Sequence, residues 1–143
     1  MCPDENISDI DMISVSSGSE VIMIPVLNLA FFGDGVYSCM VREMLVSENL
    51  TAPGKIHQES TKYVSAVFQS RLAALILDIL DEKELTVFKR GRNAHTSHTP
   101  KNASEAQYHR ATGLETLFGY LYITKNFDRL KELFAYIYKL REE

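Results

Sequence analysis

The chain has 143 residues, of which 45% are hydrophobic and 24% are charged, with a formal net charge of −4. These values are typical of one soluble globular domain and exclude a chain that is disordered over most of its length. No apolar run approaches the roughly 18 residues that a membrane-spanning helix needs, and no secretory signal is recognisable at the N-terminus. The 2 cysteines make no disulfide framework and fit a reducing cytoplasm.

The charge is unevenly distributed along the sequence. Residues 1–20 carry five acidic residues and no basic residue, so we expect a flexible acidic segment before a single domain over residues 21–143. Residues 89–110 are basic instead, with five Lys or Arg residues against Glu105 alone. A basic segment of this kind is typical of a surface that contacts nucleic acid.

Beyond the acidic segment, apolar residues recur at helical spacing and no repeat is visible, so the sequence predicts an all-α fold. The expected helices cover about residues 27–49, 57–80, 81–89, 104–124 and 126–140. Pro53 and Gly54 separate the first two helices, and Asp81 with Glu84 has the spacing of a capping box. The polar loop RGRNAHTSHTPKN, residues 90–102, separates the third helix from the fourth.

Glu115 lies in the middle of the apolar stripe of the expected helix 104–124. The rest of that stripe is Tyr108, Ala111, Phe118 and Tyr122. A lone buried carboxylate is costly, so it needs a basic partner, a strong set of hydrogen bonds or a metal ion. Glu115 therefore either binds a metal ion or lies at the edge of the stripe and pairs with an arginine such as Arg42 or Arg110.

Asp34 presents the same conflict within the string FFGDGVY, where a glycine stands on each side of it. Each glycine costs roughly 1 kcal/mol of helix stability relative to alanine, and close approach of another backbone or of a ligand would justify that cost. Asp34 could instead cap a helix that begins after a glycine break. Two inward carboxylates on separate helices would suit Mg²⁺, which takes one or two protein carboxylates and completes its shell with water and phosphate oxygens.

Several motifs, in order along the chain, resemble one enzyme family. The string NLAFFGDGVYSCMVREML resembles the signature helix of the ribonuclease III catalytic domain, and KRGRNA, TPKN, YHRATGLE and GYLY resemble its Mini-III branch. The resemblance spans about residues 26–138. It implies a homodimeric helical endonuclease domain that makes staggered cuts in double-stranded RNA, and a role in 23S ribosomal RNA precursor maturation in a bacterial cytoplasm.

Matched to the family motifs, Asp34 and Glu115 fall on catalytic positions that hold metal. The resemblance implies Mg²⁺ as the cofactor, with Mn²⁺ as a substitute. Two further acidic positions of full-length family members are Ala30 and Thr112 here, which leaves the number of metal ions open. No double-stranded RNA-binding domain follows in the sequence, so we expect the catalytic domain to bind RNA by itself.

Two aromatic residues and a set of polar residues are expected at interfaces. Phe31 matches the aromatic that family dimers insert into the partner, and Phe32 beside it is expected at the same interface. The expected RNA-binding residues are Lys62, Ser65, Gln69, Lys89, Arg90, Arg92, Asn93, Lys101, Asn102 and Arg110. Such side chains suit A-form RNA, which proteins recognise by shape, 2′-hydroxyls and backbone. A solvated basic loop and an ordinary solvent-side helix face stay open as alternatives.

Other chemistries are less well supported by the sequence. His95 and His98 have the spacing H-x-x-H, but no third zinc ligand lies near them in the chain. A non-catalytic RNA-binding protein on the same scaffold would be favoured by loss of an acidic position, and both are present. A nucleotide phosphohydrolase would need a His-Asp dipeptide, which the chain lacks.

Overall fold

The computed structural model describes residues 21, 23–48, 52–96 and 101–142. The elements in chain order are α2 (Val26–Ser47), α3 (Pro53–Val64), α4 (Ala66–Ile76), the 3₁₀ turn η2 (Leu77–Ile79), α5 (Glu82–Arg92), α6 (Glu105–Ile123), α7 (Phe127–Phe134) and α8 (Ile137–Arg141). The all-α prediction is confirmed over these ranges. The expected acidic segment lies outside the described residues and stays a prediction.

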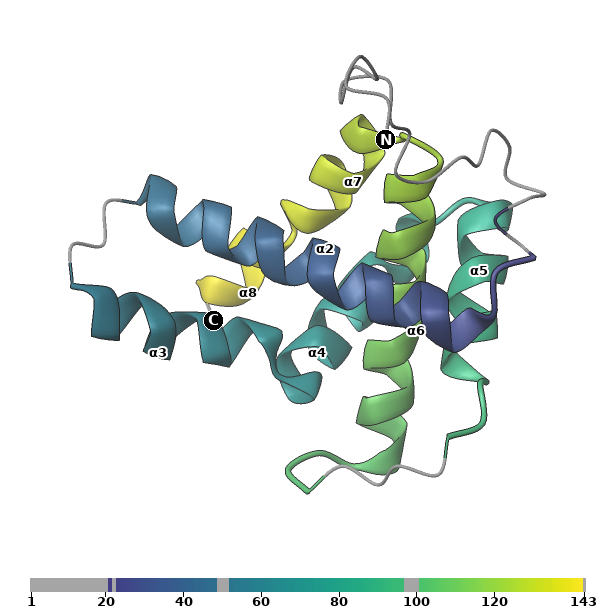
Figure 1. Cartoon of the computed structure of the whole chain (residues 1–143), viewed down its shortest axis with the longest axis horizontal. Coiled ribbons are helices and arrows are strands. Elements are labelled where there is room, and N and C mark those ends of the chain that lie inside the picture. Colours follow the sequence, from purple (N-terminus) through teal and green to yellow (C-terminus); the bar gives the residue numbers. More distant parts are fainter. Residues whose placement is uncertain (1–20, 22, 49–51, 97–100, 143) are drawn as a thin grey trace, which may run out of the picture.

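Helix α6 forms the centre of the molecule. It contacts α2, α4, α5 and α7, and Figure 1 shows α2 lying across it with α5 and α4 on either side. Leu114, Leu117 and Phe118 are completely buried on it. A helix that is apolar on nearly every side has to be covered on every side, so the other helices are arranged around α6.

Two glycines set the distance between α2 and α6 where they cross. A Cβ atom at Gly33 would overlap the backbone carbonyl of Glu115, and one at Gly119 would collide with the backbone of α2. The expected close approach of a second backbone is therefore confirmed at Gly33. Gly35 differs, because a Cβ there would meet nothing within 4 Å. Helix α2 continues through both glycines, so the alternative that Asp34 caps a helix is wrong.

The expected helix 57–80 is interrupted. Ser65 has extended backbone angles (φ −66°, ψ 150°) and divides the segment into α3 and α4. Its hydroxyl accepts a hydrogen bond from the backbone amide of Phe68 at 3.2 Å and so caps α4. The apolar periodicity could not predict this break, because buried residues occur on both sides of it and serine is only a weak signal inside a helical pattern.

Other helix ends also differ from the expected ones. Helix α5 continues to Arg92, so Arg90 and Arg92 lie on its last turn and not in a loop. The C-terminal helix divides into α7 and α8 at Ala135 and Tyr136. The expected capping box at Asp81 is confirmed, since its carboxylate accepts from an amide of the first turn at 2.8 Å. No helix in the described ranges has the length and apolar character needed to cross a bilayer.

A buried ion pair attaches α7 to α5. Glu84 is nearly inaccessible, and Arg129 donates to its two oxygens from Nε and Nη2, each at 2.9 Å. The same guanidinium also donates to the carbonyl oxygen of Ile79. These contacts satisfy a carboxylate that would otherwise be costly to bury. They hold α7 against α5 and η2.

Candidate active site

The crossing of α2 and α6 brings Asp34 and Glu115 together. Asp34 follows the glycine that touches the backbone of Glu115, and the negative charge of Asp34 acts on the Glu115 carboxyl. Burial is the main cause that raises the pKa of Glu115 to about 8, and the charge of Asp34 raises it further. The two acidic residues singled out by the sequence therefore form one electrostatically coupled pair.

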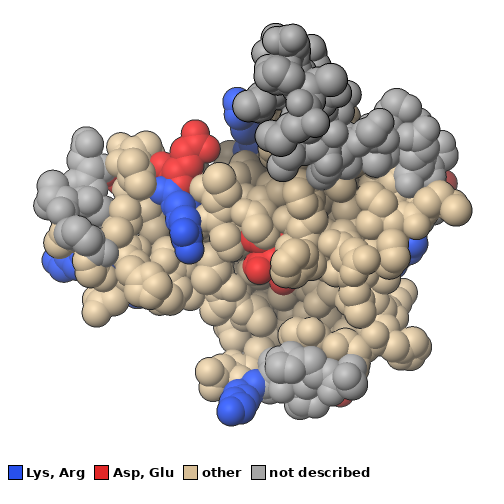
Figure 2. Space-filling view, in the orientation of Figure 1, with Lys and Arg blue, Asp and Glu red and all other residues tan. Residues whose placement is uncertain are grey.

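The two carboxyl groups differ in their access to water. Glu115 is partly buried, whereas Asp34 lies at the exposed edge of the pair. Partial desolvation nevertheless raises the pKa of Asp34 as well. Figure 2 shows acidic atoms near the middle of the face that α2 presents, within a surface that is largely neither acidic nor basic. Solvent and a ligand can thus reach the pair from the side of Asp34.

Neither arginine suggested as a partner neutralises Glu115 within the described ranges. Arg110 donates from Nη1 to the hydroxyl of buried Ser70 at 3.1 Å, and Arg42 lines a groove between α2 and α3. The ion pairs of the described residues do not involve Glu115. Glu115 thus bears the cost of burial with a second carboxylate beside it, an arrangement that a cation would relieve.

The pair fits a hard divalent cation with an incomplete protein shell. Among the described residues no group of three or more His, Cys, Asp or Glu side chains could hold a metal ion. Two carboxylates suffice for Mg²⁺, which keeps several waters and accepts phosphate oxygens. A structural zinc site needs four protein ligands. His98 lies outside the described residues and His95 is exposed, so the structure does not test the zinc alternative, which the sequence does not favour.

Tyr37 lies on the buried side of α2 near the carboxylate pair, and the sequence analysis did not single it out. It is fully buried one helical turn after Asp34, and its hydroxyl donates to the carbonyl of Tyr63 at 2.5 Å. Burial raises its pKa, and Tyr63 and Glu115 raise it further, so the hydroxyl stays protonated. A buried phenol needs a hydrogen-bond partner. A tyrosine on the apolar stripe of α2 could therefore have indicated a residue that is held in a fixed position.

Thr112 is one of the two positions at which the sequence comparison with full-length family members predicts the loss of an acidic residue. It is buried, and its hydroxyl donates to the carbonyl of Tyr108 at 3.0 Å, inside α6. Ala30, at the other such position, is also buried. Neither position therefore adds an acidic side chain to Asp34 and Glu115.

Phe31 and Phe32 point in different directions although both were expected at one interface. Phe31 is 82% exposed on α2. Phe32 is partly buried and packs edge-on against Tyr122, with 5.4 Å between ring centroids, and Tyr122 packs against Phe127 in the same way. Consecutive residues on a helix are 100° apart, so the two rings face different directions, and the expected place of both at a dimer interface stays a prediction.

Gln69 does not lie on a solvent-side face with Lys62 and Ser65. It is 2% exposed, and its amide donates to the carbonyl of Val64 at 3.1 Å. Because the helix is broken at Ser65, the residues of α4 face other directions than they would in one continuous helix with α3. A single helical wheel over both segments therefore placed Gln69 on the wrong side. Lys62 is exposed, but Glu59 binds its ammonium at 2.8 Å. The Ser65 hydroxyl is occupied as the helix cap.

The other expected RNA-binding residues lie around the end of α5 and the start of α6. The exposed ones are Lys89, Asn93, Lys101 and Asn102. Arg90 and Arg92 are partly exposed on the last turn of α5, and the Arg92 guanidinium donates to Asn93 at 3.2 Å. Arg110 is held by the hydroxyl of Ser70. A basic surface is therefore present at this end of the molecule, with part of its donors engaged inside the protein.

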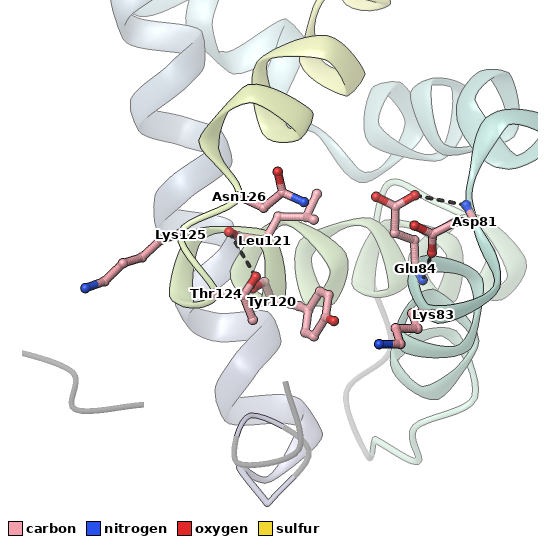
Figure 3. A pocket seen from close by; sticks show the side chains of 8 residues that line it. All are labelled: Asp81, Lys83, Glu84, Tyr120, Leu121, Thr124, Lys125 and Asn126. Atoms are coloured by element: carbon pink, nitrogen blue, oxygen red, sulfur yellow. Dashed lines mark hydrogen bonds between the residues drawn. The ribbon is translucent and has the colours of Figure 1, made fainter. Parts of the chain in front are cut away.

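A hollow of about 430 Å³ lies on another part of the molecule. Its lining consists of Asp81, Lys83, Glu84, Tyr120, Leu121, Thr124, Lys125 and Asn126. Figure 3 shows these side chains between the start of α5 and the turn from α6 to α7, with Lys125 pointing away from the hollow. Neither Asp34 nor Glu115 lines it, so this hollow is separate from the carboxylate pair.

The sequence and the fold are both similar to those of known proteins. Residues 27–126 match the ribonuclease III domain family. The Mini-ribonuclease 3 of Streptococcus pneumoniae is 45% identical over 119 residues, covering 82% of this chain and 93% of that protein. The Mini-ribonuclease 3 of Enterococcus faecalis is 42% identical over 115 residues, covering 79% of this chain and 87% of that protein.

A solved structure shares the arrangement of helices. The crystal structure of protein FN1578 from Fusobacterium nucleatum superposes with a TM-score of 0.76 at 25% identity, covering 85% of this chain and 98% of that one. The family match includes both acidic residues of the crossing between α2 and α6. The chain therefore belongs to the ribonuclease III family, within its Mini-ribonuclease 3 group, and is thus an endoribonuclease of the ribonuclease III type.

Proposed function

We propose that the chain cleaves double-stranded RNA with Mg²⁺, or Mn²⁺ in its place, held by Asp34 and Glu115. The observation that carries this proposal is the coupling of two carboxylates without a basic partner in the described ranges, at the helix crossing that the family match includes. A divalent cation held there supplies the activation of water and the neutralisation of phosphate charge that phosphodiester hydrolysis needs.

The residues of the chain have distinct tasks in this mechanism. Asp34 lies at the exposed edge and stays available to the incoming cation and phosphate. Glu115, whose pKa burial raises to about 8, would hold the cation as a carboxylate and would have to give up its proton to do so. Gly33 fixes the separation of the two helices, because its missing Cβ lets α2 touch the backbone of Glu115. The hydrogen bond from the Tyr37 hydroxyl to the Tyr63 carbonyl joins α2 to α3 on the buried side of the carboxylate pair.

We also propose that the chain acts as a homodimer, in which Phe31 is buried by a second copy. Its exposure of 82%, with Leu27 42% exposed one turn earlier on α2, supports this proposal. Large apolar side chains on one exposed helix stripe are typical of an interface. A two-fold dimer presents identical sites to two antiparallel strands, which would give staggered cuts.

The basic surface around Lys89 and Lys101 would bind the RNA backbone, with Arg90, Arg92 and Asn93 beside it. The proposed substrate is a ribosomal RNA precursor in the cytoplasm, as the resemblance of the sequence motifs to the Mini-III branch implies.

Incubation of the purified chain with a long RNA duplex tests the proposal. Cleavage should require Mg²⁺ or Mn²⁺, leave short 3′ overhangs and disappear in Asp34→Asn, whereas Asp78→Asn, which changes an exposed carboxylate of η2, should leave it intact. Duplex binding by the wild type without any cleavage would instead support the non-catalytic RNA-binding alternative.

A further inference from the structure

A groove lies between the second half of α2 and the first half of α3. Its volume is about 240 Å³, and its lining consists of Arg42, Leu45, Val46, Ile56, His57 and Ser60. Leu45 is buried and Ile56 partly buried, so they form an apolar floor, whereas Arg42 and His57 are exposed at its rim. The groove thus combines an apolar floor with cationic and N–H donors at its edge.

The cationic rim is not neutralised by the protein in the described ranges. The ion pairs and hydrogen bonds of the described residues engage neither the guanidinium of Arg42 nor the imidazole of His57, and none of the described residues that line the groove is acidic. Glu59, which precedes Ser60 on α3, is paired with Lys62. The groove therefore offers a guanidinium with free donors to an anionic ligand.

The groove lies along the same helix as the carboxylate pair. Arg42 follows Asp34 by eight residues, which corresponds to about 12 Å of helix rise and a rotation of about 80°. Figure 2 shows acidic atoms near the middle of the drawn face and a basic side chain to their left. A strand with one phosphate at the pair can therefore extend along α2 to the groove.

We propose that this groove is a phosphate-binding subsite for the RNA strand, which holds a phosphodiester adjacent to the cleavage point but not the scissile one. Arg42 would bind two phosphate oxygens through its planar fork, and His57 would donate an N–H. The apolar floor would pack against the ribose. The inference rests on the proposed binding of double-stranded RNA, and it predicts an effect on substrate affinity rather than on the chemical step.

Substitutions at Arg42 test the subsite. Arg42→Ala should raise both the Kd for a labelled duplex in EDTA and the KM in Mg²⁺ about tenfold, with kcat within about twofold of the wild type. It should also reduce the slope of log Kd against log salt by about one, the contribution of one phosphate contact. Arg42→Lys should be intermediate, since lysine keeps the charge but loses the fork.

The matched control is Lys55→Ala, which removes the same charge from an exposed position of α3 outside the groove. It should change Kd by less than about twofold and leave the salt slope unchanged. Equal effects of Arg42→Ala and Lys55→Ala would show a general contribution of positive charge and overturn the subsite. Unchanged affinity in Arg42→Ala would overturn it as well.

A second measurement leaves the protein fold untouched and locates the phosphate. A series of duplexes carries one neutral methylphosphonate linkage at successive positions from the cleavage point. One linkage position should weaken wild-type binding and should cause no further loss in Arg42→Ala, because both changes remove the same contact. Additive losses at every position would refute the assignment. Failure of the proposed function is distinguishable, since the wild type would then not cut the unmodified duplex in Mg²⁺, whereas the subsite is judged by duplex binding in EDTA.

Discussion

The raised pKa of Glu115 has a measurable consequence for stability, which the substitution Glu115→Gln isolates. The unfolded chain releases this proton near pH 4.5, whereas the metal-free folded protein keeps it to about pH 8. Between these values the folded state binds one proton more than the unfolded state. The free energy of unfolding therefore falls as the pH rises through this window and levels off above it.

Glutamine has a similar shape and cannot ionise, so Glu115→Gln should lack this loss of stability. One pKa unit corresponds to about 1.4 kcal/mol of stability. Because the site is open to solvent at Asp34, the real difference in the free energy of unfolding is smaller than the pKa shift alone would give. Glu115→Gln should thus be more stable than the wild type by about 1–3 kcal/mol at pH 7 and by less than about 1 kcal/mol at pH 5.

Urea denaturation in EDTA at several pH values measures this difference. Glu43→Gln, which changes an exposed residue of α2, serves as the control and should stay within about 0.5 kcal/mol of the wild type at every pH. Saturating Mg²⁺ should reverse the order, because only the wild type gains stability from the bound cation. A stability difference between Glu115→Gln and the wild type that does not change from pH 5 to pH 8 would refute the reasoning.

Three further predictions follow from helix α2 and the basic surface. Gly33→Ala should lower the free energy of unfolding by about 1–3 kcal/mol or more through overlap with α6, whereas Gly35→Ala should raise it by about 0.5–1 kcal/mol; similar urea midpoints for the two would contradict this. Phe31→Ala should weaken a dimer seen by sedimentation at micromolar concentration, and a wild-type monomer that cuts both strands would rule the dimer out. The double substitution of Arg90 and Arg92 by alanine should weaken duplex binding and flatten its salt dependence, with kcat retained. Unchanged binding would show that these side chains are merely solvated.

Local patterns in the sequence predicted the helices well, because helix formation depends on neighbours three and four residues apart. The capping boxes at Asp81 and Ser104 confirm the starts of α5 and α6, and the apolar spacing predicted an all-α fold. Where the sequence failed, the cause was a short-range irregularity. The break at Ser65 interrupts neither the composition nor the apolar content, yet it rotates the following helix and buries Gln69.

The sequence by itself also determined that Asp34 and Glu115 were costly in their apolar surroundings and needed a common explanation. Only the tertiary structure decided that they meet, because the contact depends on two helices far apart in the chain crossing at Gly33 and Gly119. The same holds for the different surroundings of Phe31 and Phe32 and for the groove that is lined by both Arg42 and His57. Periodicity predicts which face of a helix is buried, but the packing of the helices against one another decides which side chains share a site.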